Sequence, residues 1–242
     1  EIITRYIGRS VGFNDRRLLA PVLFSGHLEC EGRWNHPPGE SLEEFLKRSG
    51  FTSIDEVGPF SCGVLGWLAS VGSLKAAREL VRLRPNCIYE KHTHNWTVPM
   101  RSVHIPDEQY EQLLNLYPPE EQAKVVNLSS DGGITALDQA AKHGFHKNVR
   151  LLLDMRAGLE SRRLDNGATP LLSAAENHYP LCLEALIEKR ADVNATDHEN
   201  RTALHWVVDP LAVLGKTDHE GTLCCIKILL GARASVHNPR DT

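Results

Sequence analysis

The sequence offers little support for a membrane protein, a nucleic-acid-binding protein or a metalloprotein. No run of about eighteen apolar residues occurs in its 242 residues, so we expect no membrane-spanning helix. The formal net charge is −4, which argues against broad contact with the phosphate backbone of nucleic acids. None of the six cysteines forms a Cys-x-x-Cys pair, so the strongest signals for zinc and for redox chemistry are missing. We therefore expect no metal, no cofactor and no nucleic-acid partner.

Two weaker signals of enzyme chemistry fail on spacing. The tripeptide Gly215-Lys216-Thr217 resembles the end of a phosphate-binding loop, but Pro210 stands where that motif needs its first glycine. His92, His94 and His104 could gather around a metal, yet no carboxylate or cysteine stands at a diagnostic spacing from them. We expect no catalytic residues and no enzyme activity in this chain.

A repeat runs through the second half of the chain. Thr135, Thr169 and Thr202 are separated by 34 and 33 residues, and a pair of small or slim residues follows each threonine at a constant distance. An apolar stripe with the spacing of one helical face follows each pair. The stripes are Val149, Leu152 and Leu153; Leu183, Leu186 and Ile187; and, once ten inserted residues are left out of the count, Ile226, Leu229 and Leu230. Each period thus predicts two helices that pack on the neighbouring pair.

The residues around each threonine have a mechanical explanation. A threonine hydroxyl can accept a hydrogen bond from an unpaired N–H of the first helical turn, so each threonine is predicted to cap a helix. Gly133, Gly167 and Asn200 stand two residues earlier, where the turn needs a positive φ. Pro170 falls at the first helical position, where its missing N–H costs nothing.

Two stretches carry a resemblance to a known family. Thr202-Ala203-Leu204-His205 resembles the Thr-Pro-Leu-His motif of ankyrin repeats, and Arg190-Ala191-Asp192-Val193-Asn194 resembles the Gly-Ala-Asp-Val-Asn ending of the same unit. The resemblance implies an all-α ankyrin-repeat solenoid, in which a β-turn or hairpin loop precedes two antiparallel helices. It also implies that the His205 imidazole bonds to the hydroxyl of Thr202 and stiffens the unit.

About five helix-turn-helix units are expected, and the second one departs from the period. In that unit Pro106 should close a short first helix, residues 107–117 should form the second helix, and Pro118-Pro119 should open a short extension. The last unit carries an insertion at residues 209–220. The units lie near residues 61–96, 97–134, 135–168, 169–201 and 202–242.

The two ends of the repeat array need cover. Residues 1–60 do not keep the period, and we interpret them as an atypical capping or docking segment that contains a helix begun by the capping box Ser41-Leu42-Glu43-Glu44. At the other end, Leu229 and Leu230 should face inward, and no polar capping helix follows them. We expect further chain or a partner to cover that end.

The resemblance also implies where a partner binds. In ankyrin repeats the turn tips and first helices line a concave surface. The corresponding positions of this chain are those at the same distance from the start of each repeat. The candidate partner-binding residues are His94, Trp96, Lys142, His143, Asp165, Asn166, Glu176, Asn177, His198, Glu199, Arg201 and Asp209. Their charges are mixed, which favours a protein with alternating charge over a polyanion.

Three features carry open alternatives. Trp96 is either a binding hot spot or a cover for the irregular second unit. The stretch 209–220 is either a binding element or a tolerated surface loop. Asn194 lies in a context resembling that of ankyrin asparagines modified by an oxygen-dependent hydroxylase, or it simply holds its turn through side-chain bonds.

Two function classes follow from the resemblance. The first is a non-catalytic protein-protein interaction module or scaffold, as a subunit or segment of a larger assembly. The alternative is a regulatory or targeting domain of an enzyme whose catalytic part lies outside this chain. Cys182 and Cys225 occupy the same position of two second helices, where a small buried residue is expected, and reduced thiols indicate the cytoplasm or nucleus.

Overall fold

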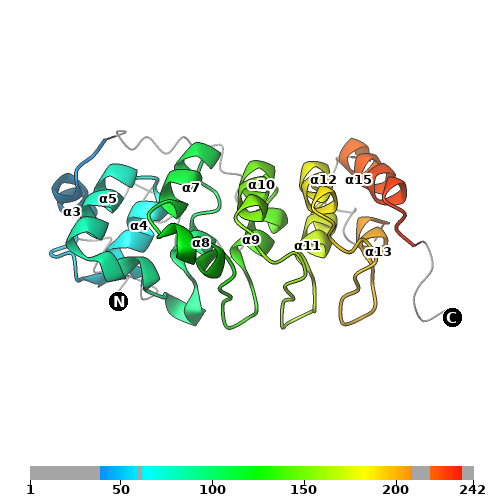
Figure 1. The fold of residues 1–242 in the computed structure, drawn as a ribbon, viewed down its shortest axis with the longest axis horizontal. Helices are drawn as coiled ribbons and strands as arrows, with labels where there is room; N and C mark the ends of the chain where they lie inside the picture. The colour runs from blue at the N-terminus through cyan, green and yellow to red at the C-terminus, as the bar shows by residue number, and fades with distance from the viewer. Residues whose placement is uncertain (1–38, 59–61, 209–218, 236–242) are drawn as a thin grey trace. The chain divides into compact units, whose positions relative to one another are not determined.

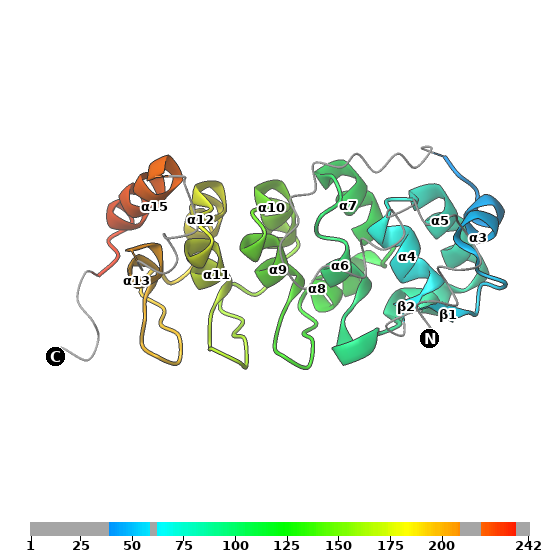
Figure 2. The same ribbon diagram turned by 180° about the vertical axis from the view of Figure 1, so that it is seen from behind.

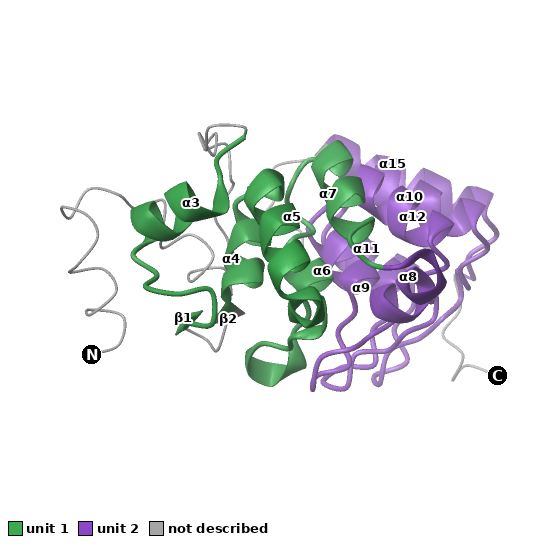
Figure 3. Cartoon of the chain, turned by 60° about the vertical axis from the view of Figure 1, so that its left-hand side comes forward, with its two compact units in different colours: residues 1–117 green, residues 118–242 purple. Residues whose placement is uncertain are grey.

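The structure is a computed structural model that describes residues 39–58, 62–208 and 219–235. The chain divides into two compact units, residues 1–117 and 118–242 (Figure 3). Helices make up nearly all the regular structure that is described in both units, which confirms the predicted all-α repeat class. The proposed boundary between a capping segment and a repeat domain at residue 60 stays a prediction.

The first described helix is α3 (Leu42–Ser49), and it begins where the capping box predicted. The Ser41 hydroxyl accepts a hydrogen bond from the Glu44 N–H, and the Glu44 carboxylate accepts one from the Ser41 N–H. Leu42 and Phe45 are buried because α3 packs against α5 (Leu74–Leu83) of the same unit. The described part of residues 1–60 therefore contributes to the core of the first unit.

Two helix pairs follow in the first unit. A two-residue antiparallel ladder of β1 (Val57–Gly58) and β2 (Cys62–Gly63) leads into α4 (Val64–Ser70), which packs on α5 as the sequence predicted. The next pair is α6 (Val98–Arg101) and α7 (Asp107–Leu114), which pack on α4 and α5 respectively.

The distorted second pair differs in detail from the expectation. Pro106 lies between the two helices but does not close the first, because α6 already ends at Arg101, and α7 ends at Leu114 rather than at residue 117. The last three residues turn away so that the Tyr117 hydroxyl can donate a 2.8 Å hydrogen bond to the Ile88 carbonyl. Between the pairs the chain forms two 3-10 segments that were not predicted, η3 (Pro85–Tyr89) and η4 (Thr93–Asn95). The extension predicted after Pro118 is a full helix, α8 (Pro119–Val126), because Pro119 occupies its first position and two acidic residues follow.

Three helix pairs stand side by side in the second unit, and the loops that precede them project to one side (Figures 1 and 2). Each first helix packs on the next first helix, and each second helix packs on the next second helix. The pairs are α9 (Ala136–Lys142) with α10 (His146–Asp154), α11 (Pro170–Glu176) with α12 (Pro180–Glu188), and α13 (Ala203–Val208) with α15 (His219–Gly231).

The core of this unit follows the predicted stripes except in the last repeat, where Leu230, expected to face inward, is 48% exposed because no described helix packs on its outer side. Leu152, Leu186 and Leu229 hold the same place in successive second helices and are fully buried. Cys182 and Cys225 are buried as well, so the prediction of small core residues is confirmed for both. Burial raises the pKa of the Cys182 thiol to about 12, which leaves the thiol protonated and unreactive.

The threonine caps are formed largely as predicted. The hydroxyls of Thr135 and Thr169 accept hydrogen bonds from the N–H of the third residue of α9 and α11, Asp138 and Leu172. Thr202 is different, because its hydroxyl lies 2.7 Å from His205 Nδ1 and its backbone N–H donates to the same nitrogen. The structural role expected for His205 is therefore confirmed.

Candidate partner-binding surface

The projecting loops of the second unit form three turns that bond to one another. Ser130, Arg163 and Asp197 each donate a backbone hydrogen bond across their own turn, to Ile134, Ala168 and Arg201. Gly133, Gly167 and Asn200 have φ values of 74°, 73° and 60°, as the sequence predicted. We call residues 130–134, 163–168 and 197–201 the turn ladder.

Backbone hydrogen bonds join the turns of the ladder. The Leu164 N–H donates to the Gly132 carbonyl at 2.9 Å, and the His198 N–H donates to the Asn166 carbonyl at 2.8 Å. A side-chain bond runs in parallel, from the Arg162 guanidinium to the Thr196 carbonyl at 2.6 Å. The turn tips are therefore held in fixed register, which lowers the entropy that a partner must remove on binding.

Five of the predicted residues lie in the ladder and are already engaged with their neighbours. Asp165 is exposed and pairs with Arg163, whose hydrogen bond holds the pKa of that carboxyl below its usual value. Asn166 accepts the Ala168 N–H, and His198 lies over Gly167, where a side chain on the glycine would collide with the imidazole. The remaining two are Glu199 and Arg201, which lie 3.4 Å apart as an ion pair.

Four further predicted residues lie at the ends of the first helices of this unit. Lys142 and Glu176 are the last residues of α9 and α11, and both are half-buried. His143 is exposed and caps α9, with its ring 6.3 Å from that of Phe145. Asn177 is half-buried and donates to the Ser173 carbonyl. The structure brings these positions and the ladder together in one unit.

The other three predicted residues are not on this surface as described. His94 and Trp96 belong to the first unit, where His94 is exposed with φ of 60° and Trp96 is half-buried. The Trp96 carbonyl accepts the His92 N–H at 2.8 Å, so Trp96 closes the turn of its own repeat. Asp209 lies outside the described residues, as does most of the insertion. Whether any of the twelve candidates binds a partner stays a prediction.

Sequence reasoning missed an exposed apolar side chain at the centre of the ladder. Leu164 is 68% exposed at the tip of the middle turn, between the paired side chains of Arg163 and Asp165. The equivalent tip residues in the neighbouring turns, Asp131 and His198, are polar. A leucine held in solvent by a bonded turn gains by being covered, because burying it removes apolar area from water.

A stacked pair at the end of the ladder was also missed. The Arg201 guanidinium lies 3.8 Å from the ring centre of Trp206, and its Nε donates to the buried carboxylate of Asp197 at 2.9 Å. Asp197 in turn accepts the backbone N–H groups of Glu199 and Arg201. Arginine and tryptophan are common at binding hot spots, and stacking fixes this arginine before any partner arrives. Trp206 lies outside the motif positions, so only its residue type could have marked it.

One buried acid lies beneath this surface. Asp138 in α9 is 1% exposed and accepts a 2.6 Å hydrogen bond from the Ser173 hydroxyl of the next first helix. Its second carboxylate oxygen is buried with no hydrogen-bond partner among the described residues. Burial raises the pKa of this carboxyl, although the Ser173 bond and the charge of Arg163 oppose the shift.

Asn194 takes part in the packing of the last repeat. Its backbone N–H donates to the Asp192 carboxylate, and its side-chain oxygen accepts the Ser235 N–H at 2.7 Å. These bonds account for an asparagine at this position without any modification. The hydroxylation itself stays a prediction.

Two features are absent from the described residues. No three His, Cys, Asp or Glu side chains in this part of the chain gather where they could hold a metal ion. No described helix has the length and apolar character needed to cross a membrane. His104, one of the three histidines weighed as ligands, instead bonds through Nε2 to the Ser70 carbonyl at 2.9 Å.

Comparison with known proteins assigns the repeats. The model of the family described as "Ankyrin repeats (3 copies)" matches residues 100–197. Human Neurogenic locus notch homolog protein 1 is 35% identical over 96 residues, which are 38% of this chain and 4% of that protein. The Ankyrin repeat and KH domain-containing protein mask of Drosophila melanogaster is 48% identical over 61 residues, 25% of this chain and 2% of the relative. The chain thus spans only a few per cent of the length of these curated relatives.

A solved structure supports the same architecture. The ankyrin repeat domain of Bcl-3 superposes with a TM-score of 0.60 over 79% of this chain and 78% of that domain, at 22% identity. Identity at this level shows the fold alone. Mouse B-cell lymphoma 3 protein homolog is also 34% identical to this chain over 73 residues, 30% of this chain and 16% of the relative.

Proposed function

The chain is an ankyrin-repeat protein, and on that premise we propose that it is a non-catalytic protein-interaction module that binds a partner through the turn ladder and the ends of the first helices. The turn ladder carries the proposal. Its backbone is fixed by hydrogen bonds between turns, and it presents exposed Leu164 beside paired charges and the Arg201–Trp206 stack. An apolar anchor within a polar rim is the usual anatomy of a protein interface.

Charge favours a protein over a polyanion as the partner. The exposed charges of the ladder include Asp131, Asp165 and Glu199, and exposed Arg162 directly precedes the middle turn, so both signs occur within a few residues. Such a surface selects a partner with a complementary pattern and gains little from a single sign of charge. Nucleic acid is therefore not proposed as a partner.

The experiment is affinity capture with the full chain as bait, followed by mass spectrometry. The native chain and three variants are compared in parallel. Leu164→Asp should lose the specific partner, and so should Arg201→Gln, because each removes a contact of the ladder and neither places a new charge against the buried carboxylate of Asp197. Leu181→Asp is the matched control, since Leu181 is also an exposed leucine but lies on α12, away from the ladder. Equal recovery of every captured protein by all versions would remove the ladder from the proposal.

A second function class is distinguished by the composition of the captured complex. If the chain is a regulatory or targeting domain of an enzyme, the enzyme's catalytic part should be recovered in stoichiometric amount, either in the same polypeptide or bound to it. The ladder variants should then change the location or regulation of that activity and leave its chemistry intact. A scaffold should instead bring together proteins that do not bind each other without it.

We also propose that further chain or a partner covers the outer face of the last repeat. Val208 of α13 is 55% exposed and Leu230 of α15 is 48% exposed. The equivalent residues of the first of these three repeats, Ala141 and Leu153, are buried where that repeat meets the next one. Hydrogen exchange of α13 and α15 should slow when the cover is present, and unchanged exchange in the native complex would argue against it.

The cytoplasm or nucleus is the proposed location. Cys87, Cys182, Cys224 and Cys225 are free thiols. Free thiols are typical of reducing compartments. Imaging of the tagged chain in cells would test this location directly.

A further inference from the structure

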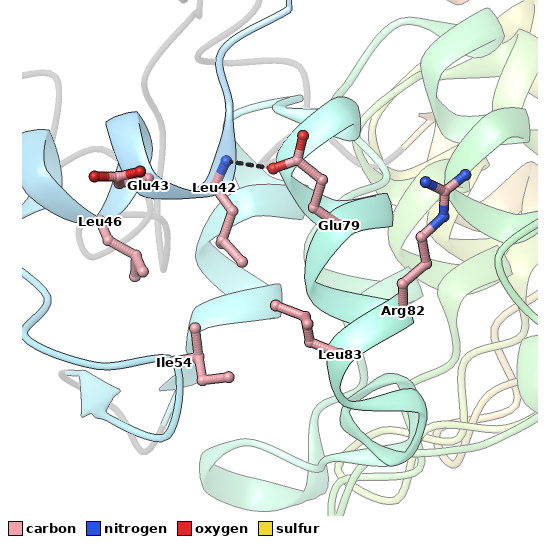
Figure 4. Close-up of a pocket in the computed structure, with 7 residues that line it drawn as sticks. All are labelled: Leu42, Glu43, Leu46, Ile54, Glu79, Arg82 and Leu83. Carbon is pink, nitrogen blue, oxygen red and sulfur yellow. Dashed lines mark hydrogen bonds between the residues drawn. The ribbon is translucent and has the colours of Figure 1, made fainter.

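An apolar groove lies between α3 and α5 of the first unit. Leu42, Leu46, Ile54 and Leu83 point into it from the two helices and the segment after α3 (Figure 4). Its volume is about 510 Å³. Leu83, the last residue of α5, is 66% exposed, so one wall of the groove is open to solvent.

Two backbone N–H groups at the start of α3, beside the groove, are bonded within the protein. The Leu42 N–H, which would otherwise be an orphan donor at the start of α3, donates to Glu79 Oε2 at 2.8 Å. The Glu44 N–H of the same helix start donates to the Ser41 hydroxyl in the capping box. The interior of the groove therefore suits aliphatic side chains, and the charged groups that line it stand at its edges.

Two charges of opposite sign flank the apolar cluster. Glu43 in the first turn of α3 and Arg82 in the last turn of α5 lie on opposite sides of the leucines (Figure 4). Within residues 39–58, 62–208 and 219–235, neither side chain has an ion-pair partner. A ligand that fills the groove gains if it brings a positive charge to Glu43 and a negative charge to Arg82.

We propose that this groove binds an amphipathic helix of another protein. The bound helix presents two aliphatic side chains one turn apart to the leucines, a basic residue to Glu43 and an acidic residue to Arg82. A helix fits because the groove is bounded by two helices and a third can lay an apolar stripe between them. A small molecule fits less well, because small-molecule pockets enclose most of their ligand and this groove leaves Leu83 in solvent. The groove and the turn ladder share no residue and belong to different units, so the two proposals stand or fall independently.

The test is selection from a displayed library of helical peptides of about 16 residues, long enough to form a helix. The full chain serves as bait. Selected peptides should carry an aliphatic pair at i and i+3 or i+4, with a basic and an acidic residue on opposite sides. Leu83→Asp should weaken their binding at least tenfold, whereas Leu181→Asp, an exposed leucine on α12, should not. If Leu83→Asp fails to fold, Leu83→Ser replaces it.

The charges provide a second, independent check. The double variant Glu43→Lys/Arg82→Glu should prefer a peptide with its two charges exchanged and bind the original one more weakly. The proposal is overturned if the selected peptides bind the Leu83 variant as tightly as the native chain, or if exchanging the charges has no effect.

Two other occupants have distinct signatures, and either result would also overturn the proposal. Faster hydrogen exchange in residues 1–38 on Leu83→Asp, with no peptide present, would assign the groove to the chain's own N-terminal segment. A dimer in sedimentation that Leu83→Asp converts to a monomer would assign it to a second copy.

Discussion

Adjacent glycines in the first turn of the ladder should respond oppositely to alanine. Gly133 has a φ of 74°, and a Cβ added there would stand 2.6 Å from the Arg162 carbonyl oxygen of the next turn. Gly132 does not have a positive φ, and a Cβ there would meet nothing closer than 3.7 Å. Gly133→Ala should therefore destabilise the second unit, and Gly132→Ala should not.

The magnitude follows from two costs at Gly133. A left-handed conformation costs a residue with a Cβ about 1–2 kcal/mol. The collision is with backbone, which cannot rotate aside, so the next turn must move and the bond from the Leu164 N–H to the Gly132 carbonyl is lost, at about 0.5–1.5 kcal/mol. We expect a total loss of about 1.5–3.5 kcal/mol for Gly133→Ala. Gly132→Ala should be neutral or should stabilise by up to about 1 kcal/mol through the unfolded chain.

The assay combines urea unfolding with hydrogen exchange at one amide. Gly133→Ala should lower the unfolding midpoint and speed exchange of the Leu164 amide, and Gly132→Ala should leave both near the native values. The reasoning is refuted if the two variants lose equal stability, or if the Leu164 amide keeps its protection in Gly133→Ala. The first result would show that the sign of φ does not determine the loss of stability. The second would show that the first turn does not hold the second one in place.

Three other variants test single contacts. Asp138→Asn should flatten the pH dependence of stability in the acidic range. Because the pKa of Asp138 is raised in the folded state, the native chain loses stability as the pH rises from the ordinary aspartate pKa through the folded pKa. The difference in urea midpoint between the variant and the native chain, measured across this pH range, isolates the contribution. Trp96→Ala should weaken partner binding at an unchanged melting temperature if the side chain is a hot spot, whereas a large loss of stability with unchanged affinity would assign it to covering its own repeat. Asn127→Ala should cost about 1–2 kcal/mol in urea unfolding, because its side chain bonds the Arg156 carbonyl and the Gly158 N–H, and an unchanged midpoint would mean that water replaces both bonds.

Much of the second unit could be predicted because its constraints are local. The turn needs a positive φ two residues before each threonine, which favours glycine or asparagine there. Gly133, Gly167 and Asn200 all have a positive φ. The helix starts at Thr135 and Thr169 need only a hydroxyl at the right place. Such requirements are met within a few residues, so the chain records them directly.

The position of Leu164 could not be predicted because it depends on a change in turn length. The hydrogen bond that closes the middle turn spans five residues, from Arg163 to Ala168, whereas those of the flanking turns span four. The step from 34 to 33 residues between the threonines records this extra residue, but the interval alone does not place it within the repeat. Aligned by threonines alone, Leu164 falls one position away from the tip that it occupies.

The first unit was less predictable for a different reason. Its second repeat replaces a regular loop with η3, η4 and a four-residue α6, and its elements are tied by side chains such as Tyr117, whose hydroxyl reaches Ile88 across 29 residues. A periodic pattern carries no information on such individual contacts. The groove between α3 and α5 is a product of the same irregularity, since α3 stands outside the period and leaves Leu83 uncovered.

Asp138 and His205 show how one repeat position can acquire two different roles. Both stand three residues after the capping threonine. His205 bonds back to Thr202 and closes its own turn, whereas Asp138 reaches forward to Ser173 and ties its repeat to the next. The aspartate bond comes with a buried carboxylate oxygen that has no hydrogen-bond partner in the described chain, so its ionised form costs stability. Protonation relieves that cost, and the junction between α9 and α11, directly below the turn ladder, should therefore be firmest at acidic pH.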